Sequence, residues 1–507
     1  MDYYTLRKLV LRIAERIKGE RILDIKGNNR LVELKLKTAS LLFSFDPEKA
    51  GLFLTERRLV EGEDHFSRSL KRFIKGLRIR DISVVEGDRL VRLSFLRVDP
   101  LGRQKSLVLV YEILGRFLNL ILIEEGIIKL ARRGMETENR VVVPGRKYFE
   151  PKRVFSNSFN LPFVNNAIAE EINKRGLEAI KEELFSSNFW VYDGKIYPYN
   201  VGGMAKRFEG DVLEHFLKDF LKYMEDRELR DRKAGIISLL KGRMKKLKSD
   251  VEKISKNMPK EEEVERYHLF GTALLTYANN VVEYTNGKYK LPNPYTGEII
   301  EIPIVDDMDP VRLANYYFTK HSTSKRSLEA ARKRLEEKRE ELGYLEDLIW
   351  QVENVSSIQD IYPIEEILGD LGLIKCSRVK REVTPCSLYY TFDFGRYKVF
   401  VGKNSKGNDY VTFRLAVGED LWFHVKDYPG AHVVMKCFDK VEESDIERVA
   451  GIALYFSKLR DTLKGDVDYT FVKNVKRLGR ILGRVLYTDY KTLRVKVYNP
   501  FEGGDHD

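Results

Sequence analysis

Two stretches of this chain repeat apolar residues at spacings of three and four, and this repeat constrains the fold more than any other feature. It is the period of an α-helix with one apolar face, which needs another apolar surface to pack against. The first stretch contains Ile236, Leu240, Met244, Leu247, Val251 and Ile254, and the second contains Leu328, Ala331, Leu335, Leu342, Leu345, Ile349 and Val352. The sequence therefore predicts a long antiparallel coiled coil over about residues 227–352.

The segment between the two seams predicts a small cap on this coiled coil. It contains Pro259, an apolar helix over about 269–281 and a hairpin-like stretch at 291–302 that is rich in turn residues. Together with the residues that follow the second seam, it forms an expected middle domain, 227–374.

Basic residues cluster on the helix faces opposite the seams. The first helix carries Lys241, Arg243, Lys245, Lys246 and Lys248, and the second carries Arg332, Lys333, Arg334, Lys338 and Arg339. Such runs are usually solvated surfaces, and neighbouring glutamates partly neutralise the second run. The first run is equally compatible with contact to phosphates.

The chain before the coiled coil predicts a strand-rich domain and a helical connector. Residues 1–153 alternate apolar and polar side chains as strands do, at 31–36, 41–45, 51–54, 91–95, 107–111 and 120–123, with helices over 2–17 and 66–74. Residues 154–226 predict a helix over 167–185 and then Gly202-Gly203 before another helix. The two glycines suit either a phosphate-binding hairpin or, more simply, a helix-entry turn.

Residues 375–507 predict an α+β domain. Strands are expected at 396–401, 410–415, 421–425 and 432–435, and a helix at about 444–459. Basic and aromatic residues interleave near the end of the domain, and Lys473, Lys476 and Arg477 are candidates for contact with RNA. The alternative is a basic edge strand whose lysines guard against aggregation.

The densest group of special residues lies in this domain. Trp422, His424, Lys426 and His432 surround the dipeptide Pro429-Gly430, which predicts a strand-turn-strand that presents the two histidines and the lysine around one mouth. Trp422 is more simply interpreted as a core residue.

Four interpretations of the two histidines compete. Hydrogen bonding to RNA is the simplest, and a buried, satisfied imidazole is the main alternative for His432, which precedes Val433. A metal site would need Asp420 or Asp427 as further ligands, and general-base chemistry would need a nucleophile that no triad spacing supplies. We expect no metal, no cofactor and no catalytic residue.

Charge and cysteine content indicate the compartment and the kind of partner. The formal net charge of +12 favours a polyanionic partner. Three scattered cysteines suggest neither zinc nor disulfides, and no export signal or apolar run of about 20 residues is evident. We expect a cytoplasmic protein with no membrane partner.

Several of these segments resemble the NFACT family. The resemblance rests on Asn408-Asp-Tyr-Val-Thr412, on Trp422-Phe-His-Val-Lys-Asp-Tyr-Pro-Gly-Ala-His432, on Tyr295-Thr-Gly-Glu298 and on Gly87-Asp-Arg89. It implies a glycosylase-like N-terminal domain and a C-terminal RNA-binding domain. It also implies tRNA contacts by Asp88, Arg89, Asp2 and Arg116. From the basic and aromatic patterns described above, we expect RNA contacts by His424, Lys426, His432, Lys473, Lys476 and Arg477, and ribosome contacts by Lys241, Arg243, Lys245 and Lys246.

The function implied by the resemblance is ribosome-associated quality control. Such a protein binds an obstructed large ribosomal subunit with its peptidyl-tRNA and ribosomal RNA, and recruits aminoacyl-tRNA, expected to be alanyl-tRNA, to extend the stalled chain. The chain ends at Asp507, as expected of the prokaryotic type without an extra C-terminal domain. Two alternatives remain: a fibronectin-binding-like adhesin, and a glycosylase-related repair protein, which would need an N-terminal proline where this chain has Met1.

Overall fold

The computed structural model describes residues 1–98, 102–115, 117–137, 140–151, 159, 161–277, 279, 283–306, 308–374, 388–437, 441–478 and 482–502. The chain divides into two compact units, Met1–Glu225 and Asp226–Asp507. In the part of the chain that is described, none of the helices has the length and apolar character needed to cross a bilayer.

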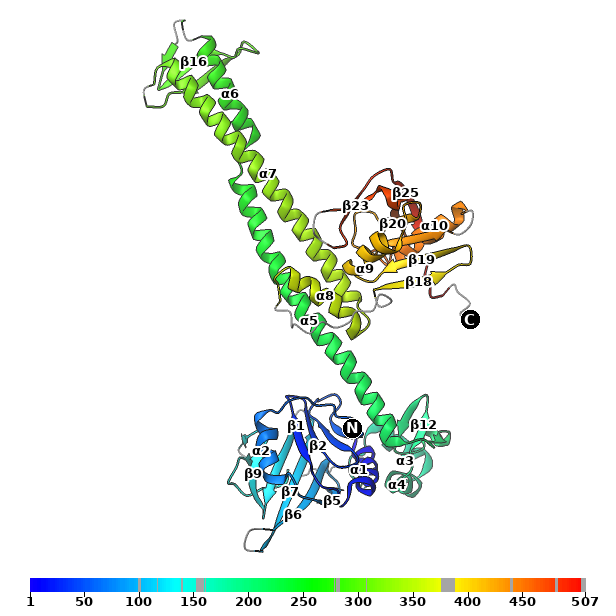
Figure 1. The fold of residues 1–507 in the computed structure, drawn as a ribbon. Coiled ribbons are helices and arrows are strands. Elements are labelled where there is room, and N and C mark those ends of the chain that lie inside the picture. Colours follow the sequence, from blue (N-terminus) through cyan, green and yellow to red (C-terminus); the bar gives the residue numbers. More distant parts are fainter. Residues whose placement is uncertain are drawn as a thin grey trace. The chain divides into compact units, whose positions relative to one another are not determined.

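The first unit contains two antiparallel sheets in which the strands follow one another in chain order (Figure 1). The first sheet comprises β1 (Asp24–Gly27), β2 (Leu31–Lys35), β3 (Ser40–Ser44) and β4 (Gly51–Thr55). The second comprises β5 (Ile79–Val84), β6 (Leu90–Val98), β7 (Gln104–Leu114), β8 (Phe117–Glu124) and β9 (Ile127–Ala131). All six predicted strands of this region are present.

One apolar core joins both sheets to α1 (Tyr3–Ile17) and α2 (His65–Ile74). Leu6, Leu9, Val10 and Ile13 are buried along one face of α1, because residues three and four apart share a face of a helix. A short hairpin, β10 (Met135–Thr137) and β11 (Arg140–Val142), completes the strands of this region.

The connector is built from short elements. The predicted helix 167–185 is in fact two helices, α3 (Asn166–Arg175) and α4 (Leu177–Phe185), since Gly176 adopts φ +91° between them and ends the first. A small sheet follows, made of β12 (Trp190–Tyr192), β13 (Lys195–Tyr197) and β14 (Lys206–Arg207). Gly202 and Gly203 lie in η1 (Val201–Gly203), a short 3-10 turn.

The second unit contains the predicted pair of long helices, α5 (Val212–Asn257), which begins in the first unit, and α7 (Pro310–Asn354) (Figure 1). Ile236, Leu240 and Leu247 of α5 share a core with Leu345 and Leu348 of α7. Arg232 of α5 pairs with Glu365, which lies beyond the end of α7, whereas Arg243 pairs with Glu341. A later residue of α5 thus pairs with an earlier residue of the partner segment, so the two helices are antiparallel.

The cap and a return helix complete this part. Beyond Pro259, α6 (Glu261–Thr276) replaces α5 as the partner of α7, and β15 (Glu283–Thr285), β16 (Lys288–Pro292) and β17 (Ile299–Pro303) form the cap sheet. The expected hairpin at 291–302 is the β16–β17 pair. Helix α8 (Ile358–Asp370) packs back onto the α5–α7 core.

The C-terminal part is a six-stranded antiparallel sheet with the order β18-β19-β21-β20-β22-β25. Its strands are β18 (Tyr389–Asp393), β19 (Tyr397–Gly402), β20 (Leu421–Val425), β21 (Val433–Cys437), β22 (Lys464–Phe471) and β25 (Lys491–Lys496). Helix α10 (Glu443–Tyr455) packs on one face. The other face is covered by α9 (Ser405–Tyr410), η3 (Val411–Leu415), η4 (Val472–Asn474) and the hairpin β23 (Val475–Arg477) and β24 (Val485–Tyr487).

The strand predicted at 410–415 is therefore wrong. Asn404 caps the N-terminus of α9 by accepting a hydrogen bond from the N–H of Gly407, and the helical path continues through η3. Val411 is buried against Trp422 by this path, so the apolar residues of the segment reflect a helix face packed on the sheet.

Candidate nucleic-acid interface

Asp88 and Arg89 lie in the turn between β5 and β6. The turn is held by Gly87, whose φ is +67° and whose N–H donates to the hydroxyl of Tyr3 at 3.1 Å. Asp88 is only 5% exposed, and its carboxylate accepts from the N–H of Arg89 at 2.7 Å. The Arg89 guanidinium lies 5.5 Å from the ring centre of Phe163, and its buried Nε has no hydrogen-bond partner among the described residues.

Asp2 lies near the same turn but has a structural role. Its carboxylate caps α1 by accepting from the N–H of Thr5 at 2.9 Å. The pKa of the Met1 amino group is lowered, first by burial and also by the charge of Arg89, while Asp2 acts in the opposite direction. The structure thus brings Asp2 and Arg89 into one neighbourhood, as the resemblance implies, with Asp2 already engaged by the helix.

Arg116 lies outside the described residues, but the strand beside it contains an ion pair that spacing did not indicate. Glu112 is buried and receives hydrogen bonds from both terminal nitrogens of Arg140, one of them at 3.0 Å, and from the Tyr148 hydroxyl at 2.8 Å. Burial and the neighbouring carboxylate raise the pKa of Tyr148. Because Arg140 and Tyr148 lie 28 and 36 residues from Glu112 in sequence, no local pattern could have revealed the network.

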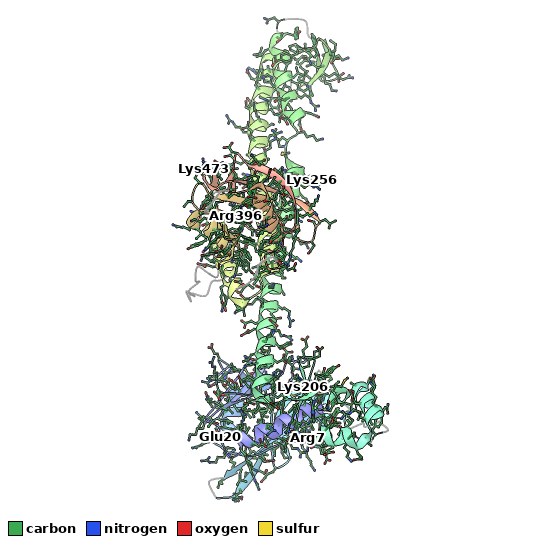
Figure 2. The ribbon with its side chains drawn as sticks, turned by 90° about the vertical axis from the view of Figure 1, so that its right-hand side faces the viewer. Arg7, Glu20, Lys206, Lys256, Arg396 and Lys473 are labelled. Carbon is green, nitrogen blue, oxygen red and sulfur yellow. The ribbon has the colours of Figure 1, made fainter. Side chains whose placement is uncertain are left out.

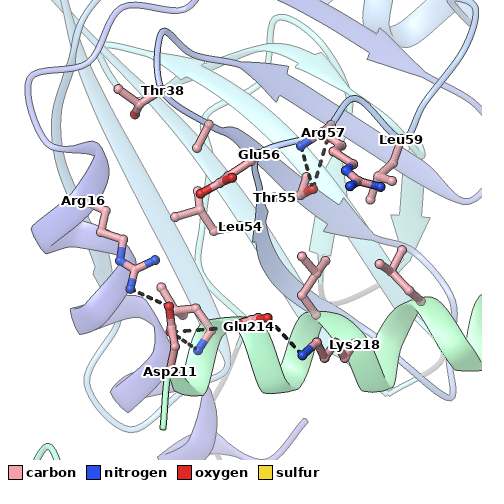
Figure 3. Close-up of a pocket in the computed structure, with 14 residues that line it drawn as sticks. Arg16, Thr38, Leu54, Thr55, Glu56, Arg57, Leu59, Asp211, Glu214 and Lys218 are labelled. Atoms are coloured by element: carbon pink, nitrogen blue, oxygen red, sulfur yellow. Dashed lines mark hydrogen bonds and ion pairs between the residues drawn. The ribbon is translucent and has the colours of Figure 1, made fainter.

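A groove of about 800 Å³ lies between α1, the β3–β4 hairpin and the start of α5 (Figure 3). Leu54, Leu59 and Leu217 are among the apolar residues that line it. Figure 3 shows that charged groups on its rim pair with one another: Arg16 with Asp211 at 2.8 Å, and Lys218 with Glu214 at 3.0 Å. Since its acidic and basic side chains balance, the groove offers no surplus charge to a nucleic acid.

The expectation that both histidines of the C-terminal part are displayed around one mouth is wrong, because His432 is buried, whereas His424 is half-buried. His432 is 2% exposed, and its ring Nδ1 lies 2.9 Å from the Thr412 hydroxyl. Its backbone N–H donates to the side-chain oxygen of Asn408. Trp422 is fully buried and its ring contacts both imidazoles, as the core interpretation predicted. Burial lowers the pKa of His424 to about 4 and holds that of His432 well below its ordinary value.

The reason for this burial is that the segment around α9 faces the helix α7. The side-chain amide of Gln351 on α7 donates to the Ser405 hydroxyl at 2.8 Å and accepts from the Ser405 N–H at 2.8 Å. A cavity of about 30 Å³ beside this contact is lined by both histidines and by Asp347 and Arg484, among others. Such a volume suits one or two water molecules.

The basic candidates of this domain differ in how far they are already paired. Arg477 forms two hydrogen bonds to the carboxylate of Asp409, at 2.8 and 2.7 Å, and Lys473 pairs with Glu419 at 3.0 Å. Lys473 projects from the surface of the domain (Figure 2). Lys476 is exposed and Lys426 is half-buried. Lys476 is thus the most available of these cations for an external phosphate.

The coiled-coil candidates divide in the same way. Lys241, Lys245 and Lys246 are exposed on α5, whereas Arg243 donates to Glu341 of α7 at 2.6 Å and 3.0 Å. Figure 2 shows side chains, Lys256 among them, projecting outward along this helix. The exposed lysines remain available to an anion, while Arg243 serves the packing of the two helices.

No metal site emerges from the described residues: they contain no group of three or more His, Cys, Asp or Glu side chains that could hold an ion. Sequence reasoning missed Lys8, a fully buried lysine whose ammonium donates to the carbonyl oxygens of Glu183, Asn188 and Pro198 at 2.8, 2.6 and 2.5 Å. It fastens α1 to the connector. Its position on the apolar side of a basic helix was the only available signal.

Comparison with known proteins gives a match over most of the chain. The family profile described as NFACT N-terminal and middle domains matches residues 2–187 and 177–385. Rqc2 homolog RqcH of Streptococcus suis (strain 05ZYH33) is 27% identical over 531 residues, covering 96% of this chain and 94% of the relative. The protein of the same name from Bacillus subtilis (strain 168) is 26% identical over 550 residues, covering 95% of each chain.

Solved structures are also similar in part. The C-terminal part of the fibronectin/fibrinogen-binding protein from Streptococcus suis covers 54% of this chain and 96% of that structure, with a TM-score of 0.41 and 23% identity. The fibrinogen binding protein from Staphylococcus aureus covers 43% of this chain and 97% of that structure, with a TM-score of 0.36 and 18% identity.

Proposed function

The chain belongs to the NFACT family, and we propose that it acts in ribosome-associated quality control by binding a large ribosomal subunit that is obstructed by peptidyl-tRNA. The observation that carries this proposal is the extent of the family match, which includes both the Asp88–Arg89 turn and the coiled coil. The names of the relatives and the net charge of +12 support it.

In this proposal the first unit holds a tRNA, which we take to be alanyl-tRNA, while the stalled chain is extended. Arg89 is the main candidate contact, because it lies half-buried in a turn and its guanidinium is held over the ring of Phe163. Asp88 orients Arg89 through the backbone contact, and Asp2 keeps α1 in place beside them. Arg116 completes the set proposed from the resemblance.

The second unit contacts ribosomal RNA. On the coiled coil, the contacts are made by exposed Lys241, Lys245 and Lys246, with Arg243 between them in sequence. In the C-terminal domain, RNA is contacted by Lys426, Lys473, Lys476 and Arg477. His424 and His432 support this surface from beneath, since their rings are engaged inside the domain. The proposed domains are 1–153, glycosylase-like; 154–226, the connector; 227–374, the coiled coil and cap; and 375–507, the RNA-binding domain.

The protein contributes positioning and no bond-making group. Aligning an aminoacyl-tRNA with a peptidyl-tRNA lowers the entropic part of the barrier, and the peptidyl-transferase centre of the ribosome performs the chemistry. The site of action is the cytoplasm, where translating ribosomes are found.

Sedimentation with purified large subunits that carry peptidyl-tRNA tests this role. Each phosphate neutralised by the protein contributes a log-log salt slope of roughly −0.7 to −0.9, so we expect binding to fall by orders of magnitude between about 50 and 200 mM salt. Combined replacement of Lys241, Lys245 and Lys246 by alanine should flatten that slope. Lys288→Ala in the cap sheet is the control, because its charge is already paired with Glu301 and it belongs to no proposed contact. Binding that ignores salt would point to a protein partner and contradict the proposal.

A further inference from the structure

Phe117 lies on a defined face of the five-stranded sheet. It pairs with Leu114 across the β7–β8 ladder, and Asn119 pairs with Glu112. Side chains of directly paired residues, and of residues two apart on one strand, lie on the same side of a sheet. Phe117 and the Glu112 carboxylate therefore lie on one face, separated by two positions along the strands.

The segment that contains Phe149 is fastened over the same face. Its neighbour Tyr148 donates to Glu112, and its own carbonyl oxygen accepts from Nε of Arg140 at 3.1 Å. The next residue, Glu150, pairs with Arg92, which lies two positions from Leu90, the β6 partner of Glu112. Three contacts thus hold Phe149 above the part of the sheet that ends in Phe117.

Both aromatic rings face solvent although this face is otherwise well packed. Phe117 is 66% exposed and Phe149 is 62% exposed, whereas Ile121, Val110 and Val142 on the same side are buried. One cation lies at the ring of Phe149, and the backbone of a second basic residue lies beside β8. The ammonium of Lys147 lies 5.6 Å from the ring centre of Phe149, and the exposed residue Arg133 is held to Asn119 by two hydrogen bonds at its backbone.

We propose that Phe117 and Phe149 form a stacking platform for unpaired bases of single-stranded RNA, with Lys147 and Arg133 contacting its phosphates. Exposed rings set among cations are the combination that single-stranded nucleic acid uses, because every base has a π-face and every linkage a charge. A protein helix would need a continuous apolar stripe to dock on, whereas Ile121, Val110 and Val142, the apolar neighbours on this face, are buried. The inference rests on the proposed function and adds a second contact region to the first unit.

The platform is preorganised by the buried network beneath it. Glu112 fixes Arg140, and Arg140 fixes the backbone of Phe149, so little conformational freedom is lost when a base stacks. Two aromatic anchors set on a rigid sheet would bind unstacked bases and would reject a duplex, whose bases are already stacked on each other.

Fluorescence anisotropy with a labelled single-stranded RNA of about 12 nucleotides tests the platform on the full chain. Loss of one stacked base costs roughly a fivefold to hundredfold loss of affinity, so Phe117→Ala and Phe149→Ala should each weaken binding by that factor. Their salt slope should stay unchanged, because no charge is removed. Phe117→Trp and Phe149→Trp should retain binding, and Lys147→Ala should reduce the slope by about 0.7. Tyr192→Ala, a 41% exposed aromatic in the same unit, is the control.

The outcomes separate this inference from the function on which it rests. Normal binding by the two alanine variants, or equal loss of binding by the alanine and the tryptophan variants, would overturn the platform while leaving the role on the ribosome intact. Duplex RNA bound as tightly as single strands would also overturn it. A chain that binds neither RNA nor large subunits would contradict the proposed function itself.

Discussion

Gln351 on α7 and Ser405 at the start of α9 form a reciprocal pair in which the amide both donates to the hydroxyl and accepts from the backbone N–H. Both residues are almost completely buried. Salt bridges from Lys406 to Glu366 and from Arg484 to Glu340 accompany the pair. The segment that looks most like an exposed binding site in the sequence is thus a joint between the coiled coil and the C-terminal domain.

We expect Gln351→Ala to loosen this joint. A buried donor left without its acceptor costs about 1–3 kcal/mol, which corresponds to roughly fivefold to hundredfold faster local opening. Hydrogen exchange measured by mass spectrometry should show this acceleration in residues 404–410. Glu346→Ala, an exposed position of the same helix, should leave it unchanged. Equal exchange in wild type and Gln351→Ala would mean that apolar contacts alone hold the joint.

Arg89→Ala should abolish binding of purified tRNA while leaving the thermal midpoint nearly unchanged. The guanidinium carries the positive charge of the Asp88–Arg89 turn, and the hydrogen bonds that hold the turn do not depend on it. Arg80→Ala, an exposed arginine of the neighbouring strand, serves as the control. A fall of several degrees in the midpoint would show instead that Arg89 has a structural role.

Lys476→Ala and Arg477→Ala should have different effects although the residues are adjacent. Removing the exposed Lys476 should lower the salt slope of RNA binding by about 0.7 to 0.9, as loss of one phosphate contact does. Removing Arg477 leaves the Asp409 carboxylate without its partner, so stability should fall more than the slope. Salt titrations of RNA binding give the slope for each variant, and chemical denaturation gives its stability. The same slope change in both variants would contradict it.

The C-terminal domain should lose stability in acid because of its two histidines. Their pKa values in the folded state lie below the ordinary value of about 6.5, so the unfolded chain binds protons first and stability falls as the pH drops from about 6.5 toward 4. His424→Gln should lessen this loss and behave as wild type at neutral pH, where the native ring is uncharged. Denaturation midpoints measured across this range provide the test.

Asp347 has the opposite effect on the pH dependence of stability, so a variant at this position supplies the control. Burial raises its pKa to about 6, so its contribution to stability falls as the pH rises from about 4 to 6. Asp347→Asn should therefore stabilise the domain at neutral pH and make its acid loss steeper. An acid response that neither variant changes would assign the loss to other groups.

The elements of the fold were largely readable from periodicity, because the burial that creates each pattern is local to one helix or strand. The seams of α5 and α7 and the strands of the first unit follow directly from it. The prediction of a strand at 410–415 was wrong because a short apolar run suits a strand and a buried helix equally. The helix cap at Asn404 is the feature that distinguishes them.

The candidate site was less readable because burial of polar groups depends on distant partners. His432 has the residue type of a surface ligand, yet Thr412, Asn408 and the cover of α7 bury it. Arg477 resembles a free cation until Asp409 is brought beside it by the fold. Phe117 and Phe149 were unremarkable in sequence, since exposure of an aromatic residue leaves no trace in its spacing.

Sequencing the RNA that co-purifies with the tagged chain from cells tests the central claim most directly. The account predicts tRNA together with ribosomal RNA of the large subunit, in complexes that sediment with that subunit and dissociate in high salt, and a selective loss of tRNA for Arg89→Ala. Recovery of no RNA above an untagged control, or of tRNA in equal amounts with wild type and Arg89→Ala, would contradict it.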